Sequence, residues 1–203
     1  MEIWQRTFYC MLMHMYPNLV AHINRFVDLT EDETAQLFRF IKPLQVKKKG
    51  FILKEGQVCK ADYFVEQGCL RMYFVNDKGI EQITQFALEH WWIADYFSML
   101  NQKKTPFNIQ AIEASEVLCI EQKVLPALFK QLPQMETYFR IMAQKAYAAS
   151  QMRTKFFHDF SKEESYRHFS SSFPEFVQRV PQYMLASYLG LTPEYLSEIR
   201  KKK

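Results

Sequence analysis

The spacing of hydrophobic residues changes twice along the chain, from a helical period to a strand period and back to a helical one. The segment up to about residue 42 has the helical pattern. Within it, Thr30 precedes Glu33 by three residues, which is the spacing of a capping box. The apolar face that follows consists of Leu37, Phe38, Phe40 and Ile41. This predicts a helix that begins after Thr30 and ends before Pro43, because proline interrupts a helix.

From Leu44 the apolar residues recur at every second position, as they do in strands. The strand-like runs are LQVKKKGFILKEGQ, DYFVEQGCLRMYFVN, IEQITQFAL and FNIQAIEASEVLCIE. Turn-forming residues separate them, at Lys49-Gly50, Glu55-Gly56, Gln67-Gly68 and Asn76-Asp77-Lys78-Gly79. Strands at this spacing, with no long helix between them, predict an antiparallel sandwich or jelly roll.

The helical period returns near residue 126 and predicts a long helix over residues 134–157. Spacings of four and three residues form the seam of a helix that pairs with a partner. The seam consists of Met135, Phe139, Met142, Ala146 and Ala149, and a second stripe of Tyr138, Ile141, Ala148 and Met152 lies beside it. The two stripes favour a dimerisation helix; the alternative is that both form the core of one chain. A second capping box, Ser161 with Glu164, predicts a further helix and then a serine-containing link.

The segment QYMLASYLGLTPEYLSEIRK has the spacing of a helix-turn-helix motif. Ala186 allows close approach of two helices, Gly190 suits the turn, and Thr192 can cap the second helix. The apolar residues that would hold the pair to its domain are Leu185, Leu189, Leu196 and Ile199. The candidate DNA-binding residues are Gln182, Thr192, Pro193, Glu194, Ser197, Glu198, Arg200 and Lys201. The alternatives are a helical hairpin that serves only packing, and a basic tail that is simply solvated.

Composition narrows the class of protein without deciding its function. The chain has 203 residues, of which 48% are hydrophobic and 24% charged, so it can bury a core and is not disordered. Its net charge of +4 is too small to indicate a polyanionic partner by itself. No apolar run approaches the ~18 residues of a membrane span, and no cleavage site follows the N-terminus, so we expect a cytoplasmic protein without membrane contact.

The spacing of cysteine and histidine residues does not indicate a metal site, a cofactor or a catalytic site. Cys10, Cys59, Cys69 and Cys119 form no C-x-x-C pair, and the five histidines form no closely spaced pair. We therefore expect reduced, buried thiols and no cofactor. An enzyme of the cupin type would need histidine and carboxylate ligands clustered on facing strands, and the sequence suggests none. The chain is accordingly predicted not to be an enzyme.

The order of these elements resembles the Crp/Fnr family of bacterial transcription regulators, the cyclic-AMP receptor protein and its relatives. The resemblance extends from about Lys42 to Lys201 and includes the hairpin YFVEQGCLRMYFVNDKGIEQITQF and the segment WWIADYFSML. It implies an α+β fold: a double-stranded β-helix sensor domain with N-terminal helices (1–133), a dimerisation helix (134–157) and a helix-turn-helix domain (158–203). It also implies a homodimer that binds double-stranded DNA at a near-palindromic operator.

The sequence departs from the family where its members bind cyclic nucleotides. Ala94-Asp95 stands in place of the family's glycine-glutamate pair, and Thr105-Pro106 in place of the arginine-serine pair that meets the phosphate. Without the guanidinium we do not expect cyclic nucleotide binding. The candidate pocket residues are Trp92, Asp95, Tyr96, Phe97, Thr105 and Pro106. They could take another small-molecule effector, or simply fill the roll. Cys10 alone and the isolated His90 support neither an iron–sulfur cluster nor a haem.

The terminal motif departs from the family as well. Glu194 matches a glutamate common in the family's recognition helix, but Glu198 stands four residues later where an arginine is usual. A glutamate accepts hydrogen bonds from cytosine, so the preferred operator should differ. The sequence also stops at Lys203, where the resemblance implies a wing. The resulting hypothesis is a homodimeric, sequence-specific DNA-binding regulator; the alternative is a small-molecule-binding or protein-interaction module that no longer recognises DNA.

Overall fold

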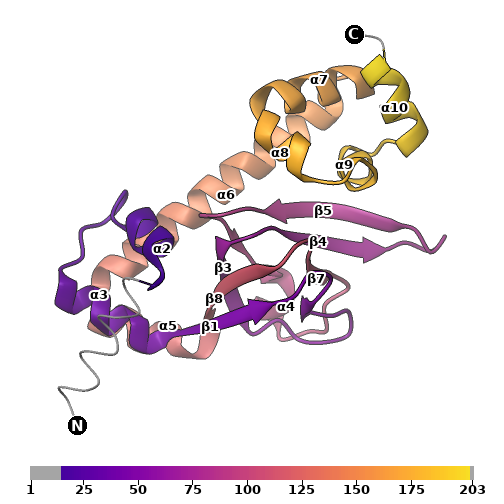
Figure 1. Cartoon of the computed structure of the whole chain (residues 1–203). Helices are drawn as coiled ribbons and strands as arrows, with labels where there is room; N and C mark the ends of the chain where they lie inside the picture. Colours follow the sequence, from indigo (N-terminus) through magenta and orange to yellow (C-terminus); the bar gives the residue numbers. More distant parts are fainter. Residues whose placement is uncertain (1–14, 202–203) are drawn as a thin grey trace. The chain divides into compact units, whose positions relative to one another are not determined.

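The structure, a computed structural model, describes residues 15–201 and divides the chain into two compact units (Figure 1). The first unit comprises the described residues up to Arg71 together with Phe86–Ala143. The second comprises Met72–Gln85 together with the described residues from Gln144 onward. Cys10 and the last two lysines, on which some of the expectations above depend, lie outside the described residues. Among residues 15–201, no helix combines the length and the apolar character needed to cross a bilayer.

Two short helices precede the sheets in the first unit, α2 (Pro17–Ile23) and α3 (Glu31–Leu37). The capping box predicted at Thr30 is confirmed: its hydroxyl accepts from the Glu33 amide at 3.2 Å, and the Glu33 carboxylate accepts from the Thr30 amide at 2.8 Å. A carboxylate from strand β3 caps the N-terminus of the other helix, α2. The Glu66 carboxylate accepts from the first-turn amides of Asn18 and Leu19, at 2.7 and 2.9 Å, and so satisfies groups that α2 itself leaves unpaired.

The predicted end of the second helix was wrong. The helix α3 stops at Leu37, a single 3₁₀ turn follows over Phe38–Phe40 (η1), and strand β1 begins at Ile41. Pro43 therefore lies inside a strand, where it was expected to end a helix. It is tolerated because β1 is the edge strand of its sheet and a proline there costs few ladder hydrogen bonds.

Two four-stranded sheets form the roll that the alternating pattern predicted. One has the order β1 (Ile41–Val46), β8 (Ser115–Glu121), β3 (Ala61–Gln67) and β6 (Trp92–Ile93), with antiparallel pairing throughout. The other has the order β2 (Phe51–Leu53), β7 (Asn108–Ala111), β4 (Leu70–Val75) and β5 (Glu81–Ala87). The two-residue strand β6 was not predicted, because it is too short to show a period. A short helix, α4 (Tyr96–Asn101), follows it.

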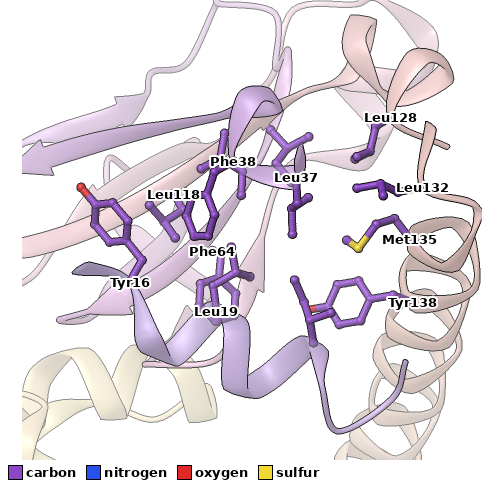
Figure 2. Close-up of a cluster of buried hydrophobic side chains, with 13 residues drawn as sticks. Tyr16, Leu19, Leu37, Phe38, Phe64, Leu118, Leu128, Leu132, Met135 and Tyr138 are labelled. Carbon is purple, nitrogen blue, oxygen red and sulfur yellow. The ribbon is translucent and has the colours of Figure 1, made fainter. Parts of the chain in front are cut away.

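Helices cover one face of the first sheet and bury the main core (Figure 2). Phe64 and Leu118 project from the sheet, Leu19 from α2, and Phe38 from η1. The covering side comes from helix α5 (Leu125–Gln131), the linking Leu132 and the start of helix α6 (Pro133–Asp159). Its buried residues are Leu128, Leu132, Met135 and Tyr138. Burying side chains of this size stabilises a fold by about 1.5–3 kcal/mol each.

Tyr138 adds directed hydrogen bonds to this apolar contact. Its hydroxyl oxygen accepts from the Trp92 indole N–H at 2.8 Å and lies 2.8 Å from Nδ1 of His22. The hydroxyl can thus accept from β6 and donate to α2 at once. Burial raises the pKa of Tyr138, so the group stays protonated at any ordinary pH. The Tyr138 side chain thereby fixes the positions of strand β6 and helix α2 relative to α6.

The long predicted helix is present as α6, but its seam is not uniform. Met135 is fully buried in the core of its own chain, and Phe139 and Met142 pack against the edge of that core. Ala146 and Ala149 are exposed, as is every residue from Ala143 to Lys155. The part of the seam that is open to a partner therefore begins beyond Met135.

The second unit contains helices α7 (Lys162–Ser172), α8 (Pro174–Arg179), α9 (Gln182–Leu189) and α10 (Pro193–Lys201). The capping box of Ser161 with Glu164 is confirmed. The serine-containing link was wrong, because α7 continues through the serines and α8 follows at once. The hydroxyls of Ser170 and Ser171 donate back to the carbonyls of Tyr166 and His168, so they stay inside the helix.

We expect Tyr138→Phe to lower the free energy of unfolding by about 2 kcal/mol, because it removes two buried hydrogen bonds while keeping the ring. Urea denaturation at neutral pH measures the change. Tyr147→Phe is the matched control: the same helix carries Tyr147 with its side chain 67% exposed, and the change should stay within about 0.5 kcal/mol. Equal effects for the two variants would contradict the role given to the Tyr138 hydroxyl.

Candidate nucleic-acid interface

The helices α9 and α10 meet at the turn that the sequence predicted. Gly190 has φ +67°, in the left-handed region that favours glycine, and its amide donates to the Ser187 carbonyl at 3.2 Å. The Leu191 amide donates to the Ala186 carbonyl at 2.9 Å. Thr192 caps α10, its hydroxyl accepting from the Tyr195 amide at 3.2 Å. This local geometry is that of a helix-turn-helix pair.

Buried apolar residues hold the pair in the second unit. Leu185 and Ala186 are fully buried on α9, and Leu196 and Ile199 are buried on α10. The other buried members of this small core are Phe176, Val180, Met184 and Leu191. Because α10 buries only the side that carries Leu196 and Ile199, the rest of its surface is open to solvent.

Five of the eight predicted DNA-binding residues lie together around a hollow of about 310 Å³. The residues that line the hollow are Gln182, Pro193, Leu196, Ser197, Arg200 and Lys201. The Gln182 side chain crosses from α9, its Nε2 donating to the Val177 carbonyl at 3.4 Å, while its Oε1 is buried with no partner among the described residues. Two cations and a hydroxyl beside one helix terminus form a surface suited to a phosphate oxygen.

The two glutamates lie on a different flank of the same helix. At 100° per residue, Glu194 and Glu198 are one turn apart and point away from the side that carries Arg200. Both are exposed, as is Thr192, and none of the three lines the hollow. Arg200 therefore lies on the side next to α9, and Glu194 and Glu198 form an acidic flank on the outer side, with Lys201 about 20° around the helix from Glu194. Carboxylates on that outer side can accept only from amino groups, such as N4 of cytosine.

Two exposed tyrosines on the same helix pair were not predicted. Tyr183, on α9, is 55% exposed, and Tyr195, on α10, is 36% exposed. Large exposed aromatics on a helix pair are unusual when no partner covers them. The sequence could have indicated their exposure, since both residues fall outside the apolar positions that pack the two helices together.

The predicted ligand-pocket residues do not form one site. Asp95 is buried and caps α4, its Oδ1 accepting from the Ser98 amide at 3.1 Å. Its Oδ2 accepts from the Thr105 hydroxyl at 2.5 Å, and that hydroxyl in turn accepts from the Phe107 amide at 3.0 Å. The carboxylate that stands where the family holds a ribose is thus fully used in joining α4 to the following loop.

The other members of that set lie apart from this pair. The Trp92 indole is directed to Tyr138 in the helical core, and its ring packs 5.2 Å from that of Phe64. Phe97 and Pro106 are exposed. The structure brings together only Asp95 and Thr105, and the hollow described above lies elsewhere.

A buried carboxylate that the sequence analysis overlooked lies next to α4. Asp62, on β3, is 3% exposed, and its only hydrogen bond among the described residues comes from the Tyr96 hydroxyl, which leaves Oδ1 unpartnered. Burial raises the pKa of Asp62 to about 6, and the hydrogen bond from Tyr96 partly opposes this. Asp62 alternates with Tyr63 along a strand, so no local pattern marked it as buried.

Within residues 15–201, Cys59, Cys69 and Cys119 are buried and form no disulfide, as the sequence predicted. Burial raises the pKa of Cys59 and raises that of Cys119 to about 11, so both remain protonated at neutral pH. Within residues 15–201, no three histidine, cysteine or acidic side chains gather as metal ligands would.

Comparison with known proteins supports the family resemblance. Residues 43–132 match the family model of the cyclic nucleotide-binding domain. The "Anaerobic regulatory protein" of Haemophilus influenzae is 28% identical over 187 residues, which cover 84% of this chain and 70% of that protein. Among solved structures, FixK2 from Bradyrhizobium japonicum has a TM-score of 0.65 at 17% identity, covering 80% of this chain and 83% of that one. The Catabolite Activator Protein of Thermus thermophilus has a TM-score of 0.53 at 16% identity, covering 89% and 85%.

The Asp62 carboxyl should make stability fall as pH rises. Its pKa in the folded state, about 6, lies above the ordinary 3.8, so between these values the folded protein holds a proton that the unfolded chain has lost. The penalty grows through that window to about 3 kcal/mol and is constant above it. Asp62→Asn removes it, so the stability of the variant relative to the unaltered protein should rise by about 3 kcal/mol between about pH 3.5 and about pH 7.5.

Urea denaturation across this range measures the difference, and other carboxyls cancel because both proteins contain them. A constant difference between Asp62→Asn and the unaltered protein would show that the Asp62 carboxyl has an ordinary pKa in the folded state.

Proposed function

We propose, since the chain belongs to the Crp/Fnr family of bacterial transcription regulators, that it is a sequence-specific DNA-binding regulator that acts as a homodimer and has no catalytic activity. The observation that carries this proposal is the α9–Gly190–α10 pair with its exposed polar face. The apolar side of the pair is buried in the core of the second unit, so the exposed side of α10 can enter a major groove. The name of the Haemophilus influenzae relative, a regulatory protein, agrees with this role.

The two flanks of α10 suggest a division of work. Arg200 and Lys201, beside Gln182, would contact phosphates, which position the protein without specifying sequence. Glu194, Ser197 and Glu198 would face base edges. Because a carboxylate accepts from cytosine and repels phosphate, we expect the half-site to contain cytosines opposite these glutamates.

The dimer would form through the exposed part of α6. Ala146 and Ala149 continue the seam that Phe139 and Met142 begin, and their small side chains permit close approach of two helices. A helix that is exposed on every side from Ala143 to Lys155 gains little from tertiary packing in one chain, and packing is what stabilises most helices. Two copies paired along α6 would present two recognition helices to half-sites ~34 Å apart.

The division into a sensor domain (1–133), a dimerisation helix (134–157) and a DNA-binding domain (158–203) stays part of this proposal. The sensor would not take a cyclic nucleotide, because Asp95 and Thr105 satisfy each other and Thr105-Pro106 stands where the family has its arginine-serine pair. A small-molecule effector of another kind is compatible with the roll, and so is a regulator that binds DNA constitutively.

The second candidate is a small-molecule-binding or protein-interaction module that has lost DNA recognition. The acidic flank of Glu194 and Glu198 favours it, because two carboxylates next to DNA phosphates weaken binding. Salt-dependent, sequence-selective affinity for duplex DNA distinguishes the two candidates.

Selection of duplexes from a random pool by the purified full chain tests the proposal. We expect enrichment of a near-palindrome with half-sites about one helical turn apart. Arg200→Ala should weaken binding of all sequences alike and lower the slope of log affinity against log salt by about 1, whereas Glu194→Ala should relax the preference at one base pair by roughly 10–100-fold.

The controls are Lys162→Ala and Glu175→Ala, which remove the same charges from exposed positions on α7 and α8 and should leave affinity and preference unchanged. Failure of any sequence to enrich, or a preference insensitive to α10, would favour the module without DNA recognition.

Ala146→Glu should shift the chain from dimer to monomer, because it places a charge in the proposed helix–helix contact. Sedimentation velocity over a range of concentrations should show a dissociation constant raised at least about 100-fold. Gln151→Glu, on the opposite side of the same helix, introduces the same charge and should leave the dimer intact. A dimer in Ala146→Glu would exclude this seam as the interface.

A further inference from the structure

The β4–β5 hairpin is part of a roll sheet by strand order but belongs to the second unit by its packing. Strand β4 crosses the boundary between the units, at Arg71 and Met72, and all of Met72–Gln85 groups with the helices from Gln144 onward. Strand β5 is the last strand of its sheet, so no strand within residues 15–201 pairs with its outer edge. An uncovered edge presents main-chain donors and acceptors that require other partners.

Ser187 on α9 supplies partners to that edge. Its hydroxyl accepts from the Ile83 amide at 3.0 Å and donates to the Glu81 carbonyl at 2.8 Å. These two main-chain groups flank a single residue and are the pair that a further antiparallel strand would engage. One side chain thus takes the place of a strand residue.

A second contact adjoins the first. The Arg153 guanidinium, on α6, donates to the Thr84 carbonyl and also lies 4.5 Å from the centre of the Tyr188 ring. Tyr188 follows Ser187 on α9, so Arg153 contacts both the hairpin and the helix that the hairpin holds. A cation over a tyrosine face is favourable as well as directional. We call Ser187, Arg153 and the main-chain groups of β5 that they engage the edge clasp.

The edge clasp leaves the DNA-facing surface of the motif open. Ser187 comes five residues after Gln182, so the two side chains lie about 140° apart around α9. Gln182 faces the hollow beside Arg200, and Ser187 faces β5. The helix can therefore be held by the hairpin while α10 contacts DNA.

We propose that Ser187 is a positioning residue for DNA recognition: through the edge clasp, β5 sets the direction of α9 and hence of α10. The inference rests on the proposed function. Because β4 runs on into the roll, the clasp gives the sensor domain a direct mechanical connection to the recognition helix, in addition to the connection through α6. Holding both recognition helices in one direction matters for an operator with two half-sites and not for a single half-site.

The chemistry of the clasp requires a hydroxyl. A serine hydroxyl is a donor and an acceptor at once, and a short side chain keeps the helix close to the strand. Ser187→Ala loses both bonds, and Ser187→Thr retains them. Ser171→Ala is the matched control, because the Ser171 hydroxyl only donates back to the His168 carbonyl of its own helix.

The first measurement is hydrogen exchange of the Ile83 amide in the full chain. We expect exchange at least about 10-fold faster in Ser187→Ala, restored in Ser187→Thr and unchanged in Ser171→Ala. Unchanged Ile83 exchange in Ser187→Ala would overturn the proposal. Arg153→Ala, which keeps the serine, should also speed exchange in the hairpin and guards against a folding defect peculiar to one variant.

The second measurement is affinity for the duplex selected above, for a single half-site, and for versions with altered half-site spacing. Ser187→Ala should bind the full operator about 10-fold more weakly and tolerate altered spacing better, with single half-site affinity unchanged. Equal losses on full and half sites would indicate a merely structural serine and overturn the inference. If the unaltered protein selects no sequence, the proposed function fails and this inference with it; if it selects DNA but the variants do not differ from it, this inference alone fails.

Discussion

The hydroxyl of Tyr138 fixes the rotation of the long helix about its axis, and much of the remaining architecture depends on that orientation. Apolar burial supplies most of the stabilisation, since each large side chain in the cluster contributes about 1.5–3 kcal/mol and a net hydrogen bond only about 1. Apolar contacts are not directional, however, so a helix can rotate about its axis in an apolar groove at little cost in free energy. The bonds to Trp92 and His22 exclude such rotation, because they require one orientation of one ring. They thereby determine which residues of α6 face the core and which remain open.

In the roll, the carboxylate at the position where the family resemblance suggests ligand binding makes hydrogen bonds within its own chain. Asp95 keeps the place of a ligand-binding carboxylate, but both of its oxygens are engaged within the chain, by the Ser98 amide and the Thr105 hydroxyl. A carboxylate so satisfied has little to gain from a ribose and would have to break buried hydrogen bonds to bind one. The unsatisfied carboxylate nearby is Asp62, whose burial is a cost to stability that neutralisation relieves. In this structure the Asp95 carboxylate supports α4 from within the chain.

In the second unit, charge and packing divide the surface of the helix pair. Leu196 and Ile199 fix the buried side of α10, Arg200 lies on the side next to α9, and Glu194 and Glu198 lie on the outer side beside Lys201. Arg200 adjoins α9, where Gln182 completes the hollow, so a phosphate contact of Arg200 and base contacts of the two glutamates would come from different sides of one helix. On α9 the opposite side is engaged by β5. The orientation of the recognition helix would thus depend on a strand edge that belongs to the sensor sheet by its order.

What the sequence determined by itself was local. Thr30 with Glu33, Ser161 with Glu164, and Gly190 between two apolar stretches each fix a helix end through residues at most four positions apart, and the alternation from Leu44 onward fixed the strands. Only the tertiary structure decided that Pro43 lies in an edge strand and that Met135 is buried in the core of its own chain. It also decided that the Thr105 hydroxyl donates a hydrogen bond to the Asp95 carboxylate. It also joined Ser187 to Ile83, 104 residues away. The reason is physical: a capping bond is encoded by short spacing, whereas a contact between distant segments depends on how the whole chain folds, and no period or spacing records it.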